Sequence, residues 1–398
     1  MLRCQPIAMF AAQHKGCQLK AMNNTSHSNT TLGEEEFDDG HGENLKEVDR
    51  IIMIGAYAFI CLFSLVGNSL IIHLVRTRNN IRKNAFNWLL FNTAVADLLD
   101  VTTSTAFTLP VFFCGDCWIS GVVGSILCKL TPFLSVVSIC VSIWTLTVIA
   151  ADRYLAIVCI RRRPLSPRSV VRSIVIVWLL ASLIFSGELP KHKLIEEEGE
   201  SAECTTEWHE NKELAQIFEE ADMIGKVVLT YAIPLFIMAV LYSSIAYFLW
   251  KQRPPGTVNQ EAYTRQKKKR NAIIKMLLMA VAVFAICWLP AHVAHIMTIF
   301  YGDIYDNIPI VVHGLFFWFA HANAAIHPWL FIAFSENLRS EVKGIFYYLR
   351  KRGPFKKTQS RTSSQPSLIT NVELAGSREI AQSRSPVNIS TISLDTRL

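Results

Sequence analysis

Long apolar stretches alternate with short polar segments along most of the chain. A helix needs about 20 mainly apolar residues to cross the hydrocarbon core of a bilayer. Seven stretches are close to this length or longer: residues 51–75, 86–113, 122–151, 170–187, 224–250, 272–300 and 308–334. Because lipid offers no hydrogen-bond partners to a backbone, each stretch is expected to be helical. The pattern predicts an all-α membrane protein built as a seven-transmembrane helix bundle, rather than a soluble protein with buried helices.

The composition also favours a membrane protein. Of the 398 residues, 51% are hydrophobic and 18% are charged, and the mean hydropathy is +0.29. Soluble globular chains carry about 25% charged residues. Disorder, collagen and coiled coils need a polar or repetitive composition, so none of them is the main architecture here.

Charged residues between the stretches alternate in sign from one side to the other. Lys and Arg resist translocation, so the basic side is cytoplasmic. Basic residues follow the first, third and fifth stretches: Arg76, Arg78, Arg82, Lys83, Arg161, Arg162, Arg163, Arg168, Lys267, Lys268, Lys269 and Arg270. Acidic runs at 34–39 and 196–200 lie on the opposite side. We therefore expect a multi-pass protein of the plasma membrane with its N-terminus outside and its C-terminus in the cytosol.

Four regions follow from this pattern. They are an extracellular tail (1–50), the seven-helix domain (51–334), a membrane-surface helix (335–348) and a disordered cytoplasmic tail (349–398). The first tail carries glycosylation sequons at Asn23, Asn24 and Asn29. Within 335–348, apolar residues recur at helical spacing with basic residues between them. That spacing indicates a short amphipathic helix lying on membrane lipid.

Polar or helix-distorting residues occur inside each stretch or directly at its end. In chain order they are Asn68, Asp97, Asp152-Arg153-Tyr154, Trp178, Pro234, Cys287-Trp288-Leu289-Pro290 and His327-Pro328. Taken together and in this order, they resemble the rhodopsin-like (class A) G-protein-coupled receptors, and among these the neuropeptide receptors. The resemblance covers about residues 51–348, three quarters of the chain.

The resemblance implies how a signal reaches a heterotrimeric G protein. Asp152, in the motif that Tyr154 completes, would neutralise Arg153 at rest, and in the active state Arg153 would extend into a cytoplasmic cavity. Trp288 would sit on the kink that Pro290 imposes by removing a backbone hydrogen bond. Ligand contact near Trp288 would then move the inner end of the sixth helix outward, a shift between two populations. Three further residues match the family's packed switch beneath the ligand: Ile143, Pro234 and Phe284.

The resemblance also implies a disulfide between Cys128, at the outer end of the third helix, and Cys204 in the second outer loop. Four more cysteines are expected outside, where disulfides persist: Cys4, Cys17, Cys114 and Cys117. Their pairing is open, because connectivity cannot be read from a sequence.

The seventh helix departs from the family pattern at two positions. His327 replaces an amide that normally faces Asp97, and Phe331 lacks the hydroxyl that would bond toward Tyr242. The polar core matches a sodium pocket at Asn68, Asp97, Ser142 and Asn323. A protonated His327 would repel the cation and pair with Asp97. A neutral, merely hydrogen-bonded His327 is the alternative, so a sodium ion is the one cofactor left open.

Three observations narrow the class of ligand. No Lys occurs between 308 and 334, so a retinal Schiff base is excluded. No carboxylate lies between Cys128 and Asp152, and Ser135 holds the position at which amine receptors carry their carboxylate. An amine ligand is therefore disfavoured. Between Glu188 and Asp222, twelve acids face only three lysines (Lys191, Lys193 and Lys212), which steers cations inward unless the loop is merely solvated. A basic, amidated neuropeptide is the predicted ligand.

Several side chains are candidates for ligand contact or for ordinary packing: Ser135, Trp118, Phe300, Tyr301, His313, Phe317 and His321. A small non-peptide ligand is the alternative for this receptor class. A transporter or channel is less expected than either kind of receptor. No internal repeat is present, and Asp97 and Asp100 are taken as the only charged residues deep in the membrane. No cluster has metal-ligand spacing and no nucleophile motif occurs, so an enzyme is not predicted.

The cytoplasmic tail suggests two more partners. Ser360, Thr362, Ser363, Ser364 and Ser367 flank Arg361 and could form a phosphorylated arrestin-docking segment. The last four residues, Asp395-Thr396-Arg397-Leu398, resemble a ligand of PDZ domains. A nucleic-acid partner is not predicted.

Overall fold

A computed structural model describes residues 47–114, 117–159, 165–197, 201–251, 260–305 and 307–351. The predictions for the two tails lie outside these residues. They concern the sequons at Asn23, Asn24 and Asn29, the cysteines Cys4 and Cys17, and the arrestin and PDZ segments. The chain divides into Met1–Arg350, which contains the helices below, and Lys351–Leu398.

Long helices occupy all seven predicted stretches. They are α1 (Glu47–Thr77), α3 (Ala85–Cys114), α4 (Gly121–Ile157), α5 (Pro167–Ile184), α7 (Lys212–Val227) continued by the π-helical turn η2 (Val228–Ala232) and α8 (Ile233–Lys251), α9 (Gln260–Phe300) and α11 (Ile310–Phe334). Short elements connect them: α2 (Asn79–Arg82), α6 (Glu188–Lys191), β1 (His192–Ile195), β2 (Glu203–Thr206), α10 (Gly302–Tyr305) and α12 (Glu336–Lys351). The predicted bundle is therefore observed.

Two helices extend well beyond their apolar stretches. The fifth begins at Lys212 rather than near 224, because the Asn211 side chain caps its first turn by accepting from the Glu213 and Leu214 amides. The sixth begins at Gln260 rather than near 272, and its added residues are mostly Gln, Lys and Arg, which favour helix in water. Hydropathy thus marks the membrane-embedded part of a helix, not its ends.

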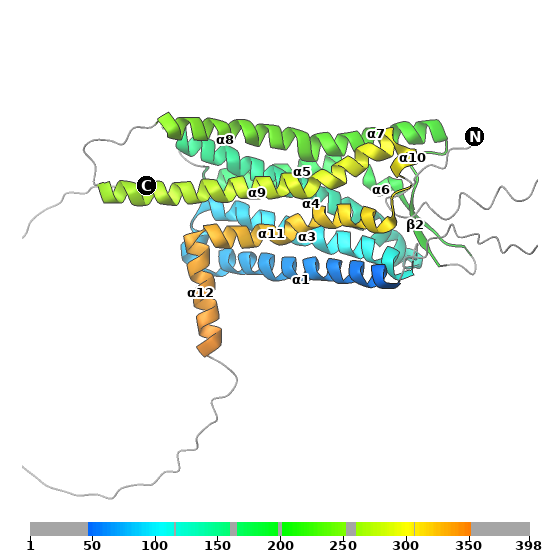
Figure 1. Ribbon diagram of the computed structural model, residues 1–398, viewed down its shortest axis with the longest axis horizontal. Helices are drawn as coiled ribbons and strands as arrows, with labels where there is room; N and C mark the ends of the chain where they lie inside the picture. The colour runs from blue at the N-terminus through cyan, green and yellow to red at the C-terminus, as the bar shows by residue number, and fades with distance from the viewer. Residues whose placement is uncertain are drawn as a thin grey trace, which may run out of the picture. The chain divides into compact units, whose positions relative to one another are not determined.

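Among the described residues, six helices are long and apolar enough to cross a membrane by length and composition, whereas α3 does not meet that measure. Instead, α3 carries buried polar residues, Asp97 and Asp100 among them. It packs against α1, α4 and α11, so its polar face lies inside the bundle (Figure 1). The opposite case is α5, which leaves Leu179 65% and Leu183 71% exposed. Such an uncovered apolar face is suited to lipid rather than to water.

One helix break is explained by proline. Pro234 has no backbone N–H to give to the preceding turn, and the widened turn η2 comes directly before it. The indole of Trp144 on α4 donates to the Leu229 carbonyl at 3.0 Å. A side chain of α4 thereby supplies a hydrogen bond to the distorted turn and joins α4 to the fifth span.

The hairpin of β1 and β2 lies at the end of the bundle opposite α12 (Figure 1). Its strands are antiparallel, with His192 opposite Thr206 and Leu194 opposite Cys204. A disulfide joins Cys204 to Cys128 near the start of α4, with the two Cα atoms 5.6 Å apart. This is the pairing that the family resemblance implied. Cys117 is disulfide-bonded as well.

The amphipathic helix predicted at 335–348 is observed as α12. Leu338 and Val342 are buried against the bundle, whereas Phe346 is 64% exposed. An ion pair of 3.3 Å between Arg78 and Glu341 holds α12 near the end of α1. One face of α12 therefore packs on the bundle and leaves the exposed aromatic residues for other contacts.

Candidate functional site

A cavity opens between the β1–β2 hairpin and the interior of the bundle. It encloses about 160 Å³ and is lined from α3, α4, α6, both strands, α7, η2, α9 and α11. Trp288 of α9 lies among the lining residues. The cavity therefore joins the loop that contains the β1–β2 hairpin to the helix that carries the predicted proline kink.

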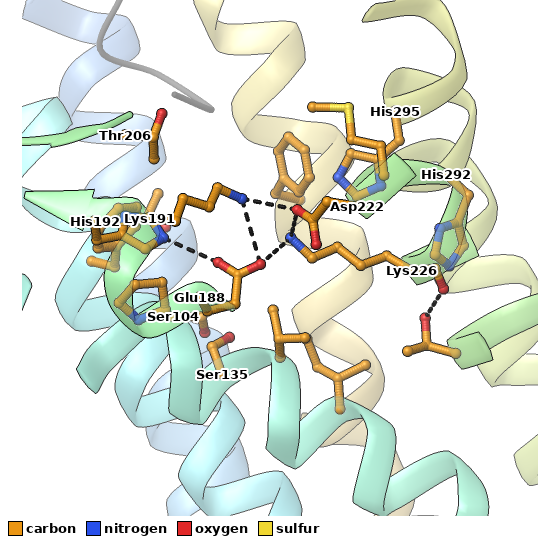
Figure 2. Close-up of a pocket in the computed structure, with 18 of the residues that line it drawn as sticks. Ser104, Ser135, Glu188, Lys191, His192, Thr206, Asp222, Lys226, His292 and His295 are labelled. Atoms are coloured by element: carbon orange, nitrogen blue, oxygen red, sulfur yellow. Dashed lines mark hydrogen bonds and ion pairs between the residues drawn. The ribbon is translucent and has the colours of Figure 1, made fainter. Parts of the chain in front are cut away.

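Four charged side chains at the cavity wall form a closed ring of alternating sign, which we call the ionic ring (Figure 2). Lys226 lies 2.5 Å from Glu188 and 2.7 Å from Asp222. Lys191 completes the ring, at 2.9 Å from Asp222 and 3.4 Å from Glu188. The four side chains are between 3% and 16% exposed. Each charge thus has two neighbours of opposite sign, and the ring as a whole is neutral.

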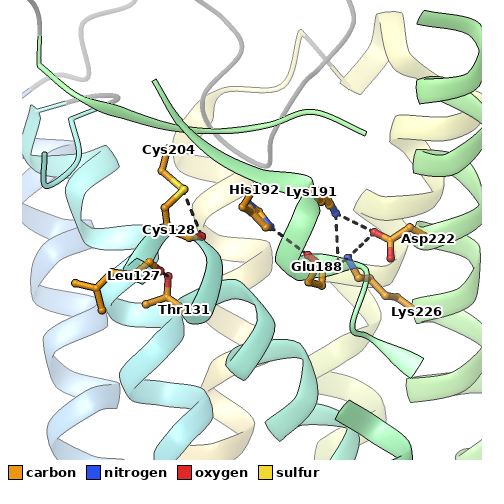
Figure 3. A network of polar contacts seen from close by, with 9 residues as sticks. All are labelled: Leu127, Cys128, Thr131, Glu188, Lys191, His192, Cys204, Asp222 and Lys226. Atoms are coloured by element: carbon orange, nitrogen blue, oxygen red, sulfur yellow. Dashed lines mark hydrogen bonds and ion pairs between the residues drawn. A yellow bond between two sulfur atoms is a disulfide. The ribbon is translucent and has the colours of Figure 1, made fainter. Parts of the chain in front are cut away.

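The ionic ring joins the loop that contains α6 and the β1–β2 hairpin to the fifth span. Glu188 and Lys191 belong to α6, whereas Asp222 and Lys226 belong to α7. Figure 3 shows the ring on one side of the hairpin and the Cys128–Cys204 disulfide on the other. The loop is therefore fastened covalently to α4 and electrostatically to α7.

His192 adds a further contact to the ring. Its Nε2 lies 3.1 Å from the Glu188 carboxylate, and its ring packs edge-on against Phe107. Burial lowers the pKa of His192, although the nearby Glu188 carboxylate opposes that change. The imidazole is therefore neutral at physiological pH.

The floor of the cavity carries a second polar group. His321 Nδ1 lies 3.1 and 3.3 Å from the two carboxylate oxygens of Asp100, and the Ser135 hydroxyl donates to Asp100 at 3.3 Å. The His321 ring packs edge-on against Trp288, with the ring centres 6.0 Å apart. Asp100 itself is only 4% exposed. Its position beside the cavity depends on the packing of α3 against α11, which the sequence alone does not show.

The face of α9 toward the cavity carries Trp288, His292 and His295. His292 packs between Trp288 and Tyr231, and its two ring nitrogens have no hydrogen-bond partner within the described part of the chain. The Tyr231 hydroxyl donates to the Ala285 carbonyl of the same helix at 2.9 Å. The fifth and sixth spans thus meet directly beside the cavity.

The predicted ligand residues divide into two groups. Ser135, Phe317 and His321 line the cavity. The others lie elsewhere: Trp118 donates to the Gly124 carbonyl at 2.9 Å, His313 stacks on Tyr305, and Phe300 and Tyr301 are 67% and 57% exposed. The expected aromatic cleft is therefore replaced by a cavity of charged, histidine and aromatic side chains.

The interpretation of the acidic loop also changes. Lys226 was not counted against the loop acids or among the charged residues deep in the membrane, yet it falls within the predicted stretch 224–250. Its contacts with Glu188 and Asp222 neutralise two of the twelve acids. A lysine inside the apolar stretch 224–250 was the available signal, although Lys129 and Lys275 also lie inside such stretches. His292 and His295, which lie one turn apart on α9, were a weaker sequence signal for this cavity.

The polar core lies beneath the cavity. Asp97 accepts from the Ser142 hydroxyl at 2.7 Å and lies 3.1 Å from His327 Nδ1. Asn68 donates to the Ala324 carbonyl at 3.0 Å rather than to Asp97. Asn323 is buried nearby on α11, and its side-chain oxygen has no hydrogen-bond partner among the described residues. Each Asp97 oxygen therefore already has one neighbour from the protein.

The switch residues implied by the resemblance are buried, and one of them, Phe284, contacts two aromatic residues beside the cavity. Phe284 lies with its ring centre 6.1 Å from that of Trp288 and 6.0 Å from that of Tyr231. Ile143 and Phe284 are buried in the same apolar cluster, and Pro234 is buried on α8. Pro290 lies inside α9, two residues beyond Trp288. A continuous aromatic path thus leads from His321 into the core.

The opposite end of α4 holds Arg153. Its guanidinium pairs with the neighbouring Asp152 carboxylate and lies 4.8 Å from the centre of the Phe86 ring. The other Asp152 oxygen accepts from the Leu165 amide at 2.8 Å. Tyr154 packs against the core, and Tyr242 is buried. Phe331 stacks on His327 and has no hydroxyl to offer to Tyr242.

Comparisons with known proteins agree with this arrangement. The model of the 7 transmembrane receptor (rhodopsin family) matches residues 67–331. The Substance-K receptor of Bos taurus is 28% identical over 326 residues, which cover 82% of this chain and 83% of that receptor. The Neuropeptide Y receptor type 2 of Cavia porcellus is 30% identical over 349 residues, covering 85% and 87%.

A third relative is the Tachykinin-like peptides receptor 86C of Drosophila melanogaster, 28% identical over 297 residues, which cover 72% of this chain but only 56% of that receptor. The matched family consists of seven-transmembrane receptors, which are not enzymes. The model match covers most of the bundle described above. The chain therefore belongs to the rhodopsin family of seven-transmembrane receptors, and its relatives are neuropeptide receptors.

Proposed function

We propose that this receptor lies in the plasma membrane with its N-terminus outside, binds a basic, amidated neuropeptide and activates heterotrimeric G proteins. The alternation of basic and acidic loops supports this orientation. The relatives named for tachykinin-like peptides, substance K and neuropeptide Y support a peptide as ligand. The observation that carries the proposal is the cavity, which reaches from the outer loop to Trp288.

The size of the cavity supports insertion of one end of a peptide. At about 160 Å³ it is smaller than a pocket for a whole drug-sized ligand, which spans about 300–1,000 Å³. The rest of a peptide would lie over the loop, whose acids beyond the ionic ring include Glu196 and Glu210. Negative charge at that surface attracts basic side chains and raises the rate of encounter.

Activation follows the contacts between the cavity and α9. A ligand that touches His321 or Trp288 acts on the aromatic path through Phe284. Because Pro290 has weakened the backbone at this point of α9, the inner half of the helix moves outward while Arg153 separates from Asp152. The ligand drives this change by binding the active state more tightly, and about 10⁴-fold selectivity shifts a population from 1:99 to 99:1.

The polar core fits a sodium ion poorly. An ion would need the Asp97 oxygens, which already contact Ser142 and His327. A protonated His327 would repel the sodium ion. A neutral His327 would still occupy more space next to Asp97 than the amide side chain that the family carries at this position. No step of the proposed mechanism depends on sodium.

Further partners complete the proposal. The exposed face of α12 would rest on membrane lipid, and the tail beyond it would bind arrestin after phosphorylation and a PDZ protein through its last residues. The sequons at Asn23, Asn24 and Asn29 would be glycosylated.

The function is tested in cells that express the receptor. A panel of amidated peptides, including substance K and neuropeptide Y, is applied while nucleotide exchange on Gα, calcium and cyclic AMP are recorded. The proposal expects at least one peptide to raise nucleotide exchange, and its unamidated form to act less strongly. A response only to small non-peptide ligands, or ligand-gated current without G protein, would contradict it.

A further inference from the structure

Two carboxylate–imidazole pairs join α3 to α11. Asp97 and His327 form one pair, and Asp100 and His321 form the other, each with a closest contact of 3.1 Å. The His327 side chain is 0% exposed, so the first pair is sealed in the core. The His321 side chain is 10% exposed and lines the cavity. The same chemistry thus occurs twice, once closed and once open to a ligand.

Asp100 is a buried carboxylate that contacts no lysine or arginine among the described residues, and its basic neighbour is His321. Its contacts within the described residues are the Ser135 hydroxyl and the His321 ring. The ring acids differ, because Glu188 and Asp222 each contact both Lys191 and Lys226. A buried charge that lacks an opposite charge is costly unless a partner arrives. Outside the ring, negative charge therefore remains at Asp100 on the floor and at Glu219 on the wall, and Asp100 is the one in contact with the cavity-lining imidazole of His321.

His321 connects the Asp100 carboxylate to the cavity. Its Nδ1 is the nitrogen that faces Asp100, so it carries the proton and donates to the carboxylate. Nε2, on the other side of the imidazole, is then an acceptor. Since His321 lines the cavity, a ligand donor placed there would be bound by Nε2 and stabilised by the Asp100 charge behind it.

We propose that the Asp100–His321 pair binds the cationic group, a guanidinium or an ammonium, of the ligand. This rests on the proposed function, in which a basic peptide enters the cavity. A guanidinium provides both the N–H donor that Nε2 lacks and the positive charge that Asp100 lacks. Its stem would pack against Trp288 and Phe317, which line the same cavity, and a cation over an aromatic face gains further.

The ionic ring does not serve as this cation site. A ligand cation there would have to displace Lys191 or Lys226 and leave a buried ammonium without its carboxylates, which is strongly unfavourable. An anionic ligand would displace Glu188 or Asp222 at the same cost and would meet the Asp100 charge below. The ring therefore lines the cavity on the route to Asp100 but does not bind the basic group of the ligand.

The test uses two probes that differ only in charge. Phenethylguanidine carries the cation and an aromatic group that suits the cavity, and phenethylurea is its uncharged analogue. Affinities of both for purified full-length receptor are measured by thermal stabilisation. We expect the guanidine to bind at least about tenfold more tightly, the change that one charge-assisted hydrogen bond supplies. Equal affinities for the two probes would overturn the proposal.

Variants locate the cation. Asp100→Asn should reduce the preference for the guanidine to within about threefold, as expected from loss of the charge. Asp97→Asn makes the same change in the sealed pair and should leave the preference intact. His321→Phe keeps an aromatic ring against Trp288 and removes the acceptor, so it should also abolish the preference. It serves as the second test should Asp100→Asn fail to fold.

Loss of the preference in Glu219→Gln but not in Asp100→Asn would place the cation at the cavity wall and contradict the proposal, since Glu219 is the lining acid outside the ring. A preference unchanged in both Asp100→Asn and His321→Phe would contradict it as well. The probes need no known peptide and no signalling. A receptor that binds them as expected but responds to no peptide would refute the proposed function and leave this site standing.

Discussion

The two ends of the helix bundle hold their charges in different ways. At the outer end, Lys226 contacts two carboxylates from different elements, in a ring that closes on itself. At the inner end, Arg153 pairs with its immediate neighbour Asp152 and rests on an aromatic ring. The ring connects segments that must stay together, whereas Arg153 can leave Asp152 without separating any two elements. The first arrangement is suited to holding a loop, and the second to switching.

The largest effect is expected from breaking the inner end. Arg153→Ala should abolish agonist-stimulated nucleotide exchange, because the group that reaches the G protein is gone, while peptide binding is retained. Exchange on Gα and peptide binding at the cell surface are measured together. Arg78→Ala removes an exposed ion pair with Glu341 and should change exchange little, since such pairs contribute about 0–1 kcal/mol. Normal exchange in Arg153→Ala would show that the inner pair is not the switch.

Breaking the outer ring should destabilise the receptor instead. Lys226→Met leaves Glu188 and Asp222 with one lysine fewer, and removing one partner of a buried ion pair costs about 3–5 kcal/mol. Thermal unfolding of purified receptor measures the loss. Lys193→Met is the matched control, because its pair with Glu207 is about half exposed and is expected to contribute under about 1 kcal/mol. Equal losses in the two variants would mean that the ring does not hold the loop.

A smaller effect is expected in the polar core between the two ends. His327→Asn removes the group that competes for Asp97 and restores the smaller amide, so sodium should begin to lower agonist affinity. Affinity is measured in sodium chloride and in choline chloride at equal ionic strength. In the unchanged receptor the two salts should give the same affinity. A sodium effect already present in the unchanged receptor would show that His327 does not exclude the ion.

The smallest effect concerns His192. Since burial lowers its pKa in the folded protein, the unfolded chain binds a proton more readily, and stability is lost as pH falls below the ordinary value of 6.5. His192→Gln should flatten the dependence of thermal stability between about pH 7 and 5, where an ordinary histidine titrates. An identical pH profile in the variant would remove His192 as its cause.

The sequence predicted the ion pair at the inner end of the bundle but not the ion pairs of the ring at the outer end. Asp152 and Arg153 are adjacent, so their pairing needs only local structure. Glu188 and Lys226 are 38 positions apart, and their contact depends on how the loop folds onto α7, which no periodicity encodes. The seven helices followed from hydropathy, but the start of α7 depended on the Asn211 cap.

Ligand candidates show the same limit. His321 and Phe317 were candidates for ligand contact or for ordinary packing, and the structure places both at the cavity. Trp118, Phe300 and His313 were candidates on the same footing, yet they are not among the residues that line the cavity, so residue type alone did not separate the two groups. Asp100 was recognised as costly in a membrane, but its contact with His321 required the packing of α3 against α11.

The most direct test of the account is the distance between the inner ends of α9 and α1 with and without agonist. Spin labels at Lys268 on α9 and Thr77 on α1, both exposed, report this distance by pulsed electron resonance. Binding of an activating peptide in the presence of G protein should lengthen it, and Pro290→Ala should reduce that change. An unchanged distance in a receptor that nevertheless stimulates nucleotide exchange would contradict the account.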